Sequence, residues 1–600
     1  QKRGAFKHLK VADIFMGGGT TLVEGSRLGM QMVGNDLNPV AWFVVKQELA
    51  NVDLEQVKML LADIEAEVKP QIMPYYFCDG PQGEKGKWTH LPSNNAMPAD
   101  FDPLAIPRYE RKDYRYEGPE IIYTFWAKHG PCQVTGCGHR TPIMTSPVMA
   151  VKTLTVKHWA HTCGKCGQAF DVEEEAARMA PDAPIYVAPS EAPYSVLDRR
   201  KGVICPHCSH TAMVNLGKGK NKRVELSLLV HPQWLAGEAK QDANGQPYGG
   251  SVQDDAAATA LWDKARALKG RLLEVRGTLP EEGADPETGL PFKTNKGTVP
   301  KPGHFACAAC GTAQRIVTSL EATKKTAPTS IVAIQGYAPK RDADGKPYSG
   351  RFFAACDAAI ARQYDTAFEE WEARKDSDLR DYWPRSEVPF GHMTHQRQPL
   401  PAHGYLSWSD MFNPRQLLVH AQLLKAIVEF GDYEWKTREF VLGAYQQYLR
   451  NQNSFCFWDS GYDKLVPHMS NNNFHPKSNV VENCVFSVLG RGNWASCSDA
   501  LIEGREWAVT PWEAVSLETL RRQHTDLAVQ ITGKSEKVYP GDPVGEVEMY
   551  QGSSTDLTHV PTASLDLVIT DPPFGGLLHY SELSDFFYVW LRLALKDKYP

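Results

Sequence analysis

The chain has 600 residues, of which 42% are apolar and 23% charged, a composition ordinary for a globular protein and a length sufficient for several domains. Its formal net charge of −6 excludes a globally basic nucleic-acid binder, so any contact with nucleic acid must come from local basic patches. No uninterrupted apolar run reaches the roughly 18–20 residues of a membrane helix, and we expect no membrane partner.

The first forty residues have the pattern of a nucleoside-binding strand, loop and helix. Residues 11–15 predict a strand, the glycine-rich 16–21 a loop, and 22–28 a helix. Glycines let the backbone approach a ligand closely, and a helix N-terminus offers free N–H groups. A second predicted strand, 32–35, ends at Asp36, whose carboxylate can accept hydrogen bonds from a ribose diol.

Eight of the thirteen cysteines fall in closely spaced pairs, which favours metal sites in a reducing cytoplasm over disulfides. In chain order the pairs are Cys132 with Cys137, Cys163 with Cys166, Cys205 with Cys208, and Cys307 with Cys310. Four thiolates from two pairs suit tetrahedral zinc. We therefore expect one structural zinc site from the first two pairs and a second from the last two, although spacing alone does not decide the second pairing. A reduced thiol cluster without metal is the alternative. His139 and His161 are either substitute ligands or solvated side chains.

The region around these cysteines is too long to be a sheet connection of ordinary length, so we interpret it as inserted domain material. Within it we expect a β-like run at 223–230 and a helix from about 254 to 275. Two basic runs, 218–223 and Lys324-Lys325, serve either as phosphate contacts that help place DNA or as solvated loops.

Further along, we predict helices over 357–374, where Phe368 and Trp371 belong to the core, over 414–430, and over 433–450. Arg415 meets either a phosphate or carboxylate ligand or a structural partner. The aromatic-laced tract 451–483 either lines a DNA groove or packs as an irregular loop.

A strand rich in β-branched residues is predicted at 565–570, and the sequence Asp571-Pro572-Pro573-Phe574 follows it directly. In open α/β sheets such strand tips bind ligands. A carboxylate, carbonyl acceptors and an aromatic ring together suit an aromatic base that bears an amino group. A tight turn after a buried strand is the alternative for this motif taken alone.

The two terminal motifs together resemble those of S-adenosylmethionine-dependent methyltransferases. Phe15-x-Gly17-x-Gly19 is similar to their first motif, and Asp571-Pro572-Pro573-Phe574 to the catalytic fourth motif of the class that methylates adenine N6 or cytosine N4 in DNA. The tract 579–592 resembles a subgroup of large bacterial methyltransferases that have an uncharacterised N-terminal region and are often encoded in phage-defence loci. The resemblance covers about 5–50 and 400–600, with the middle matched only loosely.

This resemblance implies a role for each motif residue. The residues that would bind the cofactor S-adenosylmethionine are Asp13, Phe15, Gly17, Gly19, Thr20 and Asp36, with Ser553 and Asp556 from a third motif. Ser553 stands where an acid is common, so Asp556 is the fallback. Asp571 and Pro572 would accept from the target amino group, and Phe574, where tyrosine is commoner, would stack on the base. An acidic first position favours adenine.

The resemblance also implies an α/β fold with a Rossmann-like methyltransferase core, a doubly wound sheet interrupted by a large insertion with zinc-ribbon-like modules. The expected units are 1–70 and 501–600 for the two parts of the core, 120–330 for the zinc-ribbon insertion, 331–400 for a linker and helical segment, and 401–500 for a candidate DNA-recognition element. The expected partners are double-stranded DNA and subunits of a restriction–modification or defence system. A methyltransferase acting on RNA or a protein amide, and a DNA-binding component with weak or lost methylation, are the alternatives.

Overall fold

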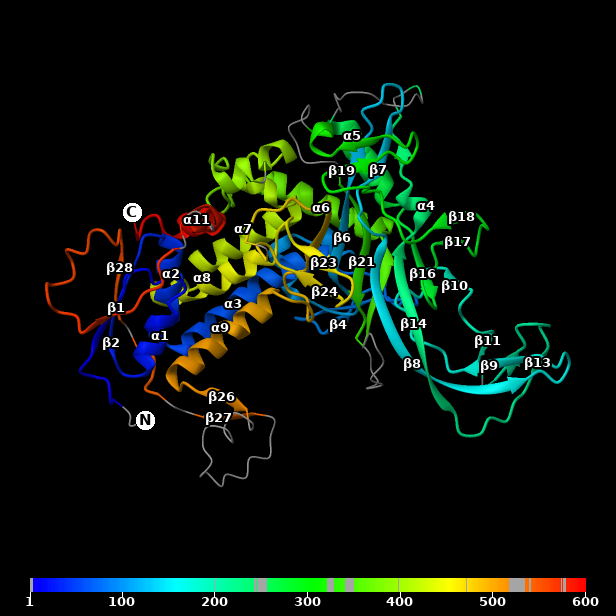
Figure 1. The fold of residues 1–600 in the computed structure, drawn as a ribbon, viewed down its shortest axis with the longest axis horizontal. Helices are drawn as coiled ribbons and strands as arrows, with labels where there is room; N and C mark the ends of the chain where they lie inside the picture. The colour runs from blue at the N-terminus through cyan, green and yellow to red at the C-terminus, as the bar shows by residue number, and fades with distance from the viewer. Residues whose placement is uncertain are drawn as a thin grey trace.

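The structure is a computed structural model that describes residues 4–198, 200–241, 244, 256–320, 329–339, 350–397, 399–470, 472–516, 535–538, 541–545, 547–573, 575 and 579–599. It is a mixed α/β protein with three regions along its long axis: a small sheet at one end, a helical layer in the middle, and larger sheets with a projecting arm at the other end (Figure 1). Within the described residues, no helix combines the length and apolarity that crossing a bilayer requires.

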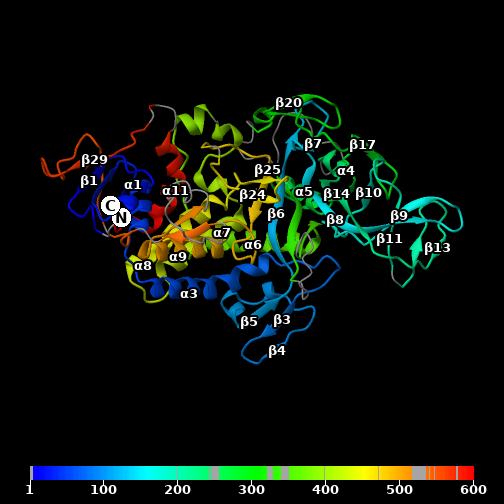
Figure 2. The ribbon, with the colours of Figure 1, turned by 60° about the horizontal axis from the view of Figure 1, so that its bottom comes forward.

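The small sheet joins the two ends of the chain. Its strand order is β28 (Glu548–Gln551), β2 (Gln31–Asp36), β1 (Lys10–Asp13) and β29 (Leu567–Val568), and all three pairings are parallel. Both views show the blue N-terminal elements beside the orange and red C-terminal ones (Figures 1 and 2). Helices α1 (Thr20–Arg27) and α2 (Pro39–Glu48) pack against this sheet. Because its strands are all parallel, their carboxyl ends share one edge.

The helical layer holds the largest apolar core. Its helices are α3 (Leu54–Ile72), α6 (Ala358–Arg374), α7 (Pro414–Glu429), α8 (Trp435–Arg450), α9 (Trp494–Val509) and α11 (Tyr580–Leu595). Asn413 and Gln416 form a capping box at the start of α7, with Pro414 at its first turn, where the missing N–H of proline costs nothing. The predicted helices at 357–374, 414–430 and 433–450 correspond to α6, α7 and α8. Trp371 is buried as predicted, but Phe368 is 44% exposed and lies outside the core.

Arg415, at the start of α7, is a structural residue. Its Nε donates to Glu482 Oε1 at 2.7 Å and both side chains are fully buried. Glu482 also accepts from Tyr76 Oη at 2.9 Å and from Trp126 Nε1 at 3.1 Å. Removing one partner of a buried pair costs roughly 3–5 kcal/mol, so Arg415 serves the fold, and the structural alternative of the sequence analysis is the correct one.

The remaining sheets form the other end of the molecule. A central antiparallel sheet has the order β15 (Glu238–Ala239), β7 (His139–Pro142), β6 (Glu120–Pro131), β21 (Thr329–Tyr337) and β22 (Arg351–Ala355), and β25 (Asn479–Asn483) also pairs with β6. A second sheet has the order β10 (Ile185–Val187), β16 (Leu272–Arg276), β14 (Lys220–Val230), β8 (Val148–Thr162), β9 (Ala169–Glu173) and β11 (Tyr194–Val196). The long strands β8 and β14 carry an arm that projects from the body (Figure 1).

Short elements complete the fold. The small two- and three-stranded sheets are β12 (Val203–Ile204) with β13 (Thr211–Ala212), β17 (Glu282–Ala284) with β18 (Pro291–Lys293), β19 (His304–Ala306) with β20 (Ala313–Arg315), β23 (Phe457–Asp459) with β24 (Lys464–Val466), β26 (Glu513–Ser516) with β27 (Ser535–Val538), and β3 (Lys87–His90) between β4 (Asn95–Ala96) and β5 (Tyr114–Glu117). Two short helices are α4 (Pro232–Leu235) and α5 (Ala256–Ala267). The predicted helix at 254–275 is too long, because α5 ends at Ala267 and its apolar C-terminal part forms β16 instead.

Candidate functional sites: a shared strand edge and two cysteine tetrads

The structure places the two terminal motifs on adjacent strands. Strand β1 pairs with β29 in the register Val11 with Leu567 and Ala12 with Val568. The ladder extends beyond the strand at both ends, because Asp566 N donates to Lys10 O at 2.8 Å and Ile569 N donates to Ala12 O at 2.9 Å. The loop after β1 and the segment after β29 therefore leave the same edge of the sheet.

A side-chain contact links the two motifs at that edge. The hydroxyl of Thr570 donates to Asp13 Oδ1 at 2.9 Å across 557 sequence positions, and the same oxygen accepts from Phe15 N at 3.1 Å. Asp13 is only 3% exposed, so its carboxylate is a buried connector between the end of β29 and the start of the glycine turn. Sequence reasoning missed Thr570; a hydroxyl directly before the acidic motif was the available signal.

The glycine turn has the conformation that only glycine adopts easily. Gly17 and Gly19 have φ values of +48° and +77°, in the left-handed region. A Cβ at Gly19 would lie 2.8 Å from Val45 Cγ2 on α2. Gly19 precedes α1, which has neither an acid in its first turn nor a side-chain cap, so its first N–H groups remain available to a ligand. Thr20, the first residue of α1, is exposed.

Asp36, at the end of β2, holds this turn. Its Oδ2 accepts from Gly17 N at 2.9 Å and its Oδ1 accepts from Asn38 N at 2.8 Å. Each carboxylate oxygen has a second lone pair, so the group can hold the turn and still accept from a ribose hydroxyl. The structure thus brings Gly17 and Asp36 into direct contact.

The segment after β28 lies beside Asp36. Gly552 N donates to Asp36 O at 3.0 Å, and Asn35 Nδ2 donates to Gly552 O at 2.9 Å. Ser553 follows and is exposed. Asp556 is also exposed, and its Oδ1 accepts from Thr558 Oγ1 at 3.0 Å within the same turn. Ser553 directly follows Gly552, which contacts Asp36, whereas Asp556 lies farther along the same loop.

The acidic motif itself is open to solvent. Asp571, Pro572 and Pro573 are all exposed and follow directly on the Thr570 contact with Asp13. Phe574, the predicted stacking residue, lies outside the described residues.

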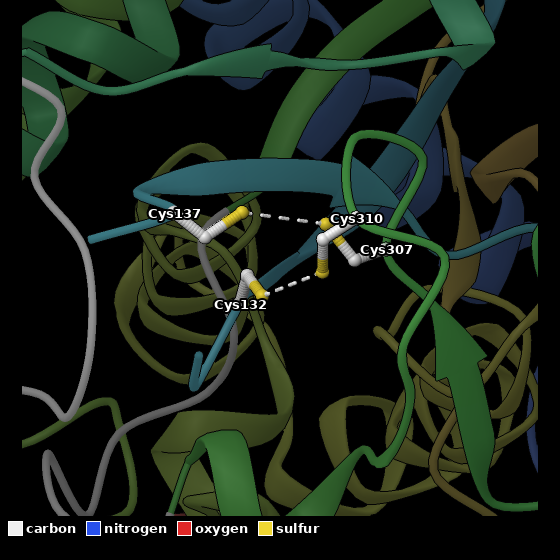
Figure 3. Close-up of side chains that lie close together, drawn as sticks. All are labelled: Cys132, Cys137, Cys307 and Cys310. Atoms are coloured by element: carbon white, nitrogen blue, oxygen red, sulfur yellow. Dashed lines mark hydrogen bonds between the residues drawn. The ribbon is translucent and has the colours of Figure 1, made fainter. Parts of the chain in front are cut away.

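The eight paired cysteines form two compact tetrads. One consists of Cys132, Cys137, Cys307 and Cys310 (Figure 3), and the other of Cys163, Cys166, Cys205 and Cys208. The two pairs of the first tetrad face each other at Sγ–Sγ distances of 3.7 and 3.8 Å, and those of the second at 3.7 Å. A zinc tetrahedron with bonds of about 2.3 Å has sulfurs about 3.8 Å apart, so both tetrads can hold a zinc ion.

The predicted pairing of these cysteines is wrong. The first and last pairs form one site, and the two middle pairs form the other, so the sites are nested in the chain rather than consecutive. The reason is the arm. In the sequence, β8 leads outward before the two middle pairs and β14 leads back after them, so these pairs lie on the arm, away from its base. The inner tetrad belongs to the arm, beside β9 and the hairpin of β12 and β13.

Each pair has the backbone of a metal-binding knuckle. The second cysteine of every pair is followed by a residue with positive φ: Gly138 at +60°, Gly167 at +73°, Ser209 at +57° and Gly311 at +72°. In three of the pairs this residue donates its N–H to the first cysteine's carbonyl, at 2.8–2.9 Å. Ser209 is the exception in residue type, since a non-glycine rarely adopts this conformation.

Local hydrogen bonds favour the thiolate form of one cysteine in each tetrad. The backbone N–H groups of Cys166 and Lys165 lower the pKa of Cys163 to about 6. Contacts with Thr312 lower the pKa of Cys310 to about 6. The thiolate is the form that binds metal, so these contacts favour metal binding by Cys163 and Cys310, whereas burial raises the pKa of Cys132 and Cys307.

The histidines near the tetrads have other partners. His139 Nε2 lies 2.8 Å from Ala236 O, and the His161 ring packs edge-on against Phe170. In the basic run 218–223, Lys222 forms ion pairs with Asp171 and Glu173 at 3.2 and 3.0 Å. The second basic run, Lys324-Lys325, lies outside the described residues.

Comparison with known proteins gives one short match. A segment of 67 residues, 11% of this chain, is 30% identical to the type II methyltransferase M.MvaI of Kocuria varians. That segment spans 15% of the length of the relative. No protein-family model matches the chain, and no solved structure matches it. The chain is therefore distantly similar to a methyltransferase over a small part of its length.

Proposed function

We propose that this protein transfers a methyl group from S-adenosylmethionine to an exocyclic amino group of DNA, most favourably N6 of adenine. The observation that carries the proposal is the pairing of β1 with β29 and the Thr570–Asp13 contact. These put a glycine turn suited to a nucleoside and an acidic, proline-rich strand tip at one edge of a sheet. The similarity of one segment to a type II methyltransferase supports the same reaction class.

The strand order supports a cofactor site at this edge. From β1 the chain proceeds to β2 and β28 on one side, and it then crosses to β29 on the other. In open parallel sheets, ligands bind outside the carboxyl ends of strands where the order reverses. We propose that this sheet belongs to a Rossmann-like methyltransferase core, with the reversal between β1 and β29 as the place where donor and acceptor meet.

The residues at this edge suit the cofactor. Gly17 and Gly19 allow close approach of the backbone, the start of α1 offers N–H donors, and Asp36 accepts from the ribose diol. Ser553 and Asp556, on the loop next to Asp36, are the candidates for contact with its adenine. When bound, S-adenosylmethionine supplies an electrophilic methyl group.

The residues after β29 act on the target base. A base within duplex DNA cannot reach a strand-tip site, so it must be flipped out of the helix. We assign to the Asp571 carboxylate and the Pro572 carbonyl the role of accepting from its amino group, which localises the nitrogen lone pair. Phe574 stacks on the base in this scheme. Orientation of the nitrogen toward the methyl group supplies much of the acceleration.

The cysteine tetrads have a structural role in this proposal. Four thiolates complete a tetrahedral zinc site and leave no open coordination position, so we assign them no part in methyl transfer. Within the long region between the two parts of the core, 401–500 is the candidate DNA-recognition element. From the resemblance of the tract 579–592 we infer a restriction–modification or phage-defence setting for this activity.

Transfer of a radiolabelled methyl group tests the proposal. The purified chain is incubated with labelled S-adenosylmethionine and duplex DNA, and the DNA is digested and analysed for methylated nucleosides. We expect N6-methyladenine. Label in N4-methylcytosine would redirect the proposal to the other target of this class, whereas label in RNA or protein, or cofactor uptake without transfer, would refute it.

A further inference from the structure

A large cavity lies between the central sheet and the hairpin of β23 and β24, away from the edge of the parallel sheet. Its volume is about 970 Å³, at the upper end of the range of about 300–1,000 Å³ typical of small-molecule sites. Its walls come from β6, β23, β25, the loop after β7, and the short helix η6 (Leu400–His403). Segments far apart in sequence therefore converge on one hollow that the methyl-transfer scheme does not use.

The charge of this cavity has one sign. Lys128, Lys301, Lys477, His403 and His475 line it, and none of the described lining residues is an aspartate or glutamate. This is unusual in a chain whose acidic residues outnumber its basic ones, with 71 Asp and Glu against 65 Lys and Arg. Three lysines, with no carboxylate among the described lining residues, make this cavity positively charged, which favours an anionic ligand.

Lys128 is the buried member of this set. It is 6% exposed, and its ammonium donates to Tyr405 Oη at 2.6 Å rather than to a carboxylate. Burying a charge is costly unless a counter-charge compensates for it. Burial, together with the nearby Lys128 and His475, lowers the pKa of His403 to about 4, and burial lowers the pKa of Lys477. Burial is the main cause in both cases, and a bound anion would stabilise the charged form of each group.

Aromatic side chains line the cavity beside Lys477. The Lys477 ammonium lies 4.1 Å from the centroid of the Phe457 ring. The neighbouring Trp458 also lines the cavity, and its indole N–H donates to Met149 O at 2.8 Å. Its ring packs edge-on against Tyr123 and Phe125, with centroids 5.1 Å apart in both cases. Trp458 is therefore held in a fixed orientation beside the cationic groups.

We propose that this cavity binds a nucleotide, with the phosphate held by Lys128 and Lys477 and the base stacked on the wall that contains Trp458. Ammonium groups recognise phosphate as point charges, and aromatic side chains stack on any base with little regard to sequence. Two sources offer this chemistry, a free mononucleotide and a nucleotide within a nucleic-acid strand. The site does not depend on methyl transfer at the parallel sheet.

Calorimetric titration of the whole chain tests the proposal and separates the two sources. The probes are the four deoxynucleoside monophosphates, deoxyadenosine, inorganic phosphate, and single-stranded and duplex oligonucleotides, all with S-adenosylhomocysteine at saturation to occupy the other site. We expect at least one monophosphate or the single strand to bind at least tenfold more tightly than deoxyadenosine and than phosphate. Binding by the monophosphate identifies a free nucleotide as the ligand. Binding by the strand alone identifies nucleic acid.

Two lysines on the same part of the fold provide the matched pair. Lys477→Ala should weaken binding at least tenfold. Lys464→Ala should leave it unchanged, because Lys464 also lies over a ring, 4.4 Å from the Tyr462 centroid, but does not line the cavity. Asp36→Asn should have no effect on this binding, so failure of the methyl-transfer proposal would not be mistaken for failure here.

A crosslinking measurement on the unaltered chain tests the proposal without requiring that any variant folds. Ultraviolet crosslinking of the tightest probe should attach it to the peptide that contains Trp458, as mass spectrometry would show. The proposal is overturned if no probe binds saturably, if phosphate binds as tightly as any nucleotide, if the two lysine variants behave alike, or if the crosslink maps elsewhere.

Discussion

The edge of the parallel sheet and the cysteine tetrads both join distant parts of the chain, but by different means. At the sheet edge, β29 contributes two residues to the ladder with β1, and one side-chain hydrogen bond spans 557 positions. The outer tetrad spans 170–178 positions between facing cysteines, and the inner one 39–45. With zinc bound, each tetrad would close through four metal–thiolate bonds, whereas the sheet edge closes through a few hydrogen bonds.

This difference indicates where each region is vulnerable. As zinc sites, the tetrads would depend on the ion and on the backbone turns that orient the thiolates, and they would stabilise the insertion. The sheet edge depends on close packing and on two hydrogen bonds. The turn packs against α2 because Gly19 has no Cβ, and the carboxylates of Asp36 and Asp13 accept from the backbone N–H groups of Gly17 and Phe15. Perturbations should therefore separate the two regions.

Loss of the outer metal site should have the largest effect on stability. Cys307→Ser and Cys205→Ser should each reduce bound zinc from two ions to one per chain, as native mass spectrometry would measure. Cys307→Ser should be the more destabilising by about 1 kcal/mol, because loop-closure entropy grows by about 0.6 kcal/mol per doubling of loop length and the outer loop is about four times longer. Equal thermal midpoints in the two variants would contradict the dependence of stability on loop length. Retention of both ions in either variant would refute the assigned ligands.

Substitution in the glycine turn should have the next largest effect. Gly19→Ala should destabilise the protein by about 1–3 kcal/mol, the usual cost of strain at a left-handed residue, since its Cβ would also lie 2.8 Å from Val45 Cγ2. Gly18→Ala is the control: a Cβ there meets no atom within 4 Å, so the change should stay within about 0.5 kcal/mol. Thermal unfolding of both variants checks the difference, and equal midpoints would contradict the described turn.

A smaller effect is expected from Asp36. Asp36→Asn keeps one acceptor but loses the charge, and should weaken S-adenosylmethionine binding about tenfold, or roughly 1.4 kcal/mol. Asp53→Asn is the control, because Asp53 caps α3 through Glu55 N and asparagine caps as well as aspartate. Calorimetric titration with the cofactor measures both. Unchanged affinity in Asp36→Asn would remove Asp36 from the cofactor site.

The sequence predicts the sheet edge well because its signals are local. Glycines before a helix, an acid at a strand end and β-branched runs each specify backbone geometry within a few residues. Parallel pairing of β1 with β29 then follows if both motifs serve one site, and the structure has that pairing. The helices α6, α7 and α8 were predictable for the same reason, because the spacing of apolar residues and capping residues such as Asn413 specify a helix locally.

What the sequence does not reveal depends on long-range arrangement. The knuckle Cys132-x4-Cys137 is recognisable by itself, but its partner Cys307 is fixed by how the arm of β8 and β14 leaves and returns. The partner of Arg415 is Glu482, on a strand of the central sheet. The aromatic residues of the tract 451–483 also have different environments. Phe474 is fully buried, as a packed loop predicts, whereas Trp458 lines the cavity beside Lys477.

The central claim, that the tips of β1 and β29 form one methyl-transfer site, is tested most directly by replacing two acids of one segment. Asp571 follows β29 at the carboxyl edge, and Asp566 precedes it at the amino edge, where its Oδ2 accepts from Lys10 N at 2.8 Å. We predict that Asp571→Asn lowers single-turnover methyl transfer to DNA by at least about 100-fold without changing cofactor affinity, and that Asp566→Asn retains near-normal transfer. Normal transfer by Asp571→Asn, or loss of transfer in both variants alike, would contradict the claim.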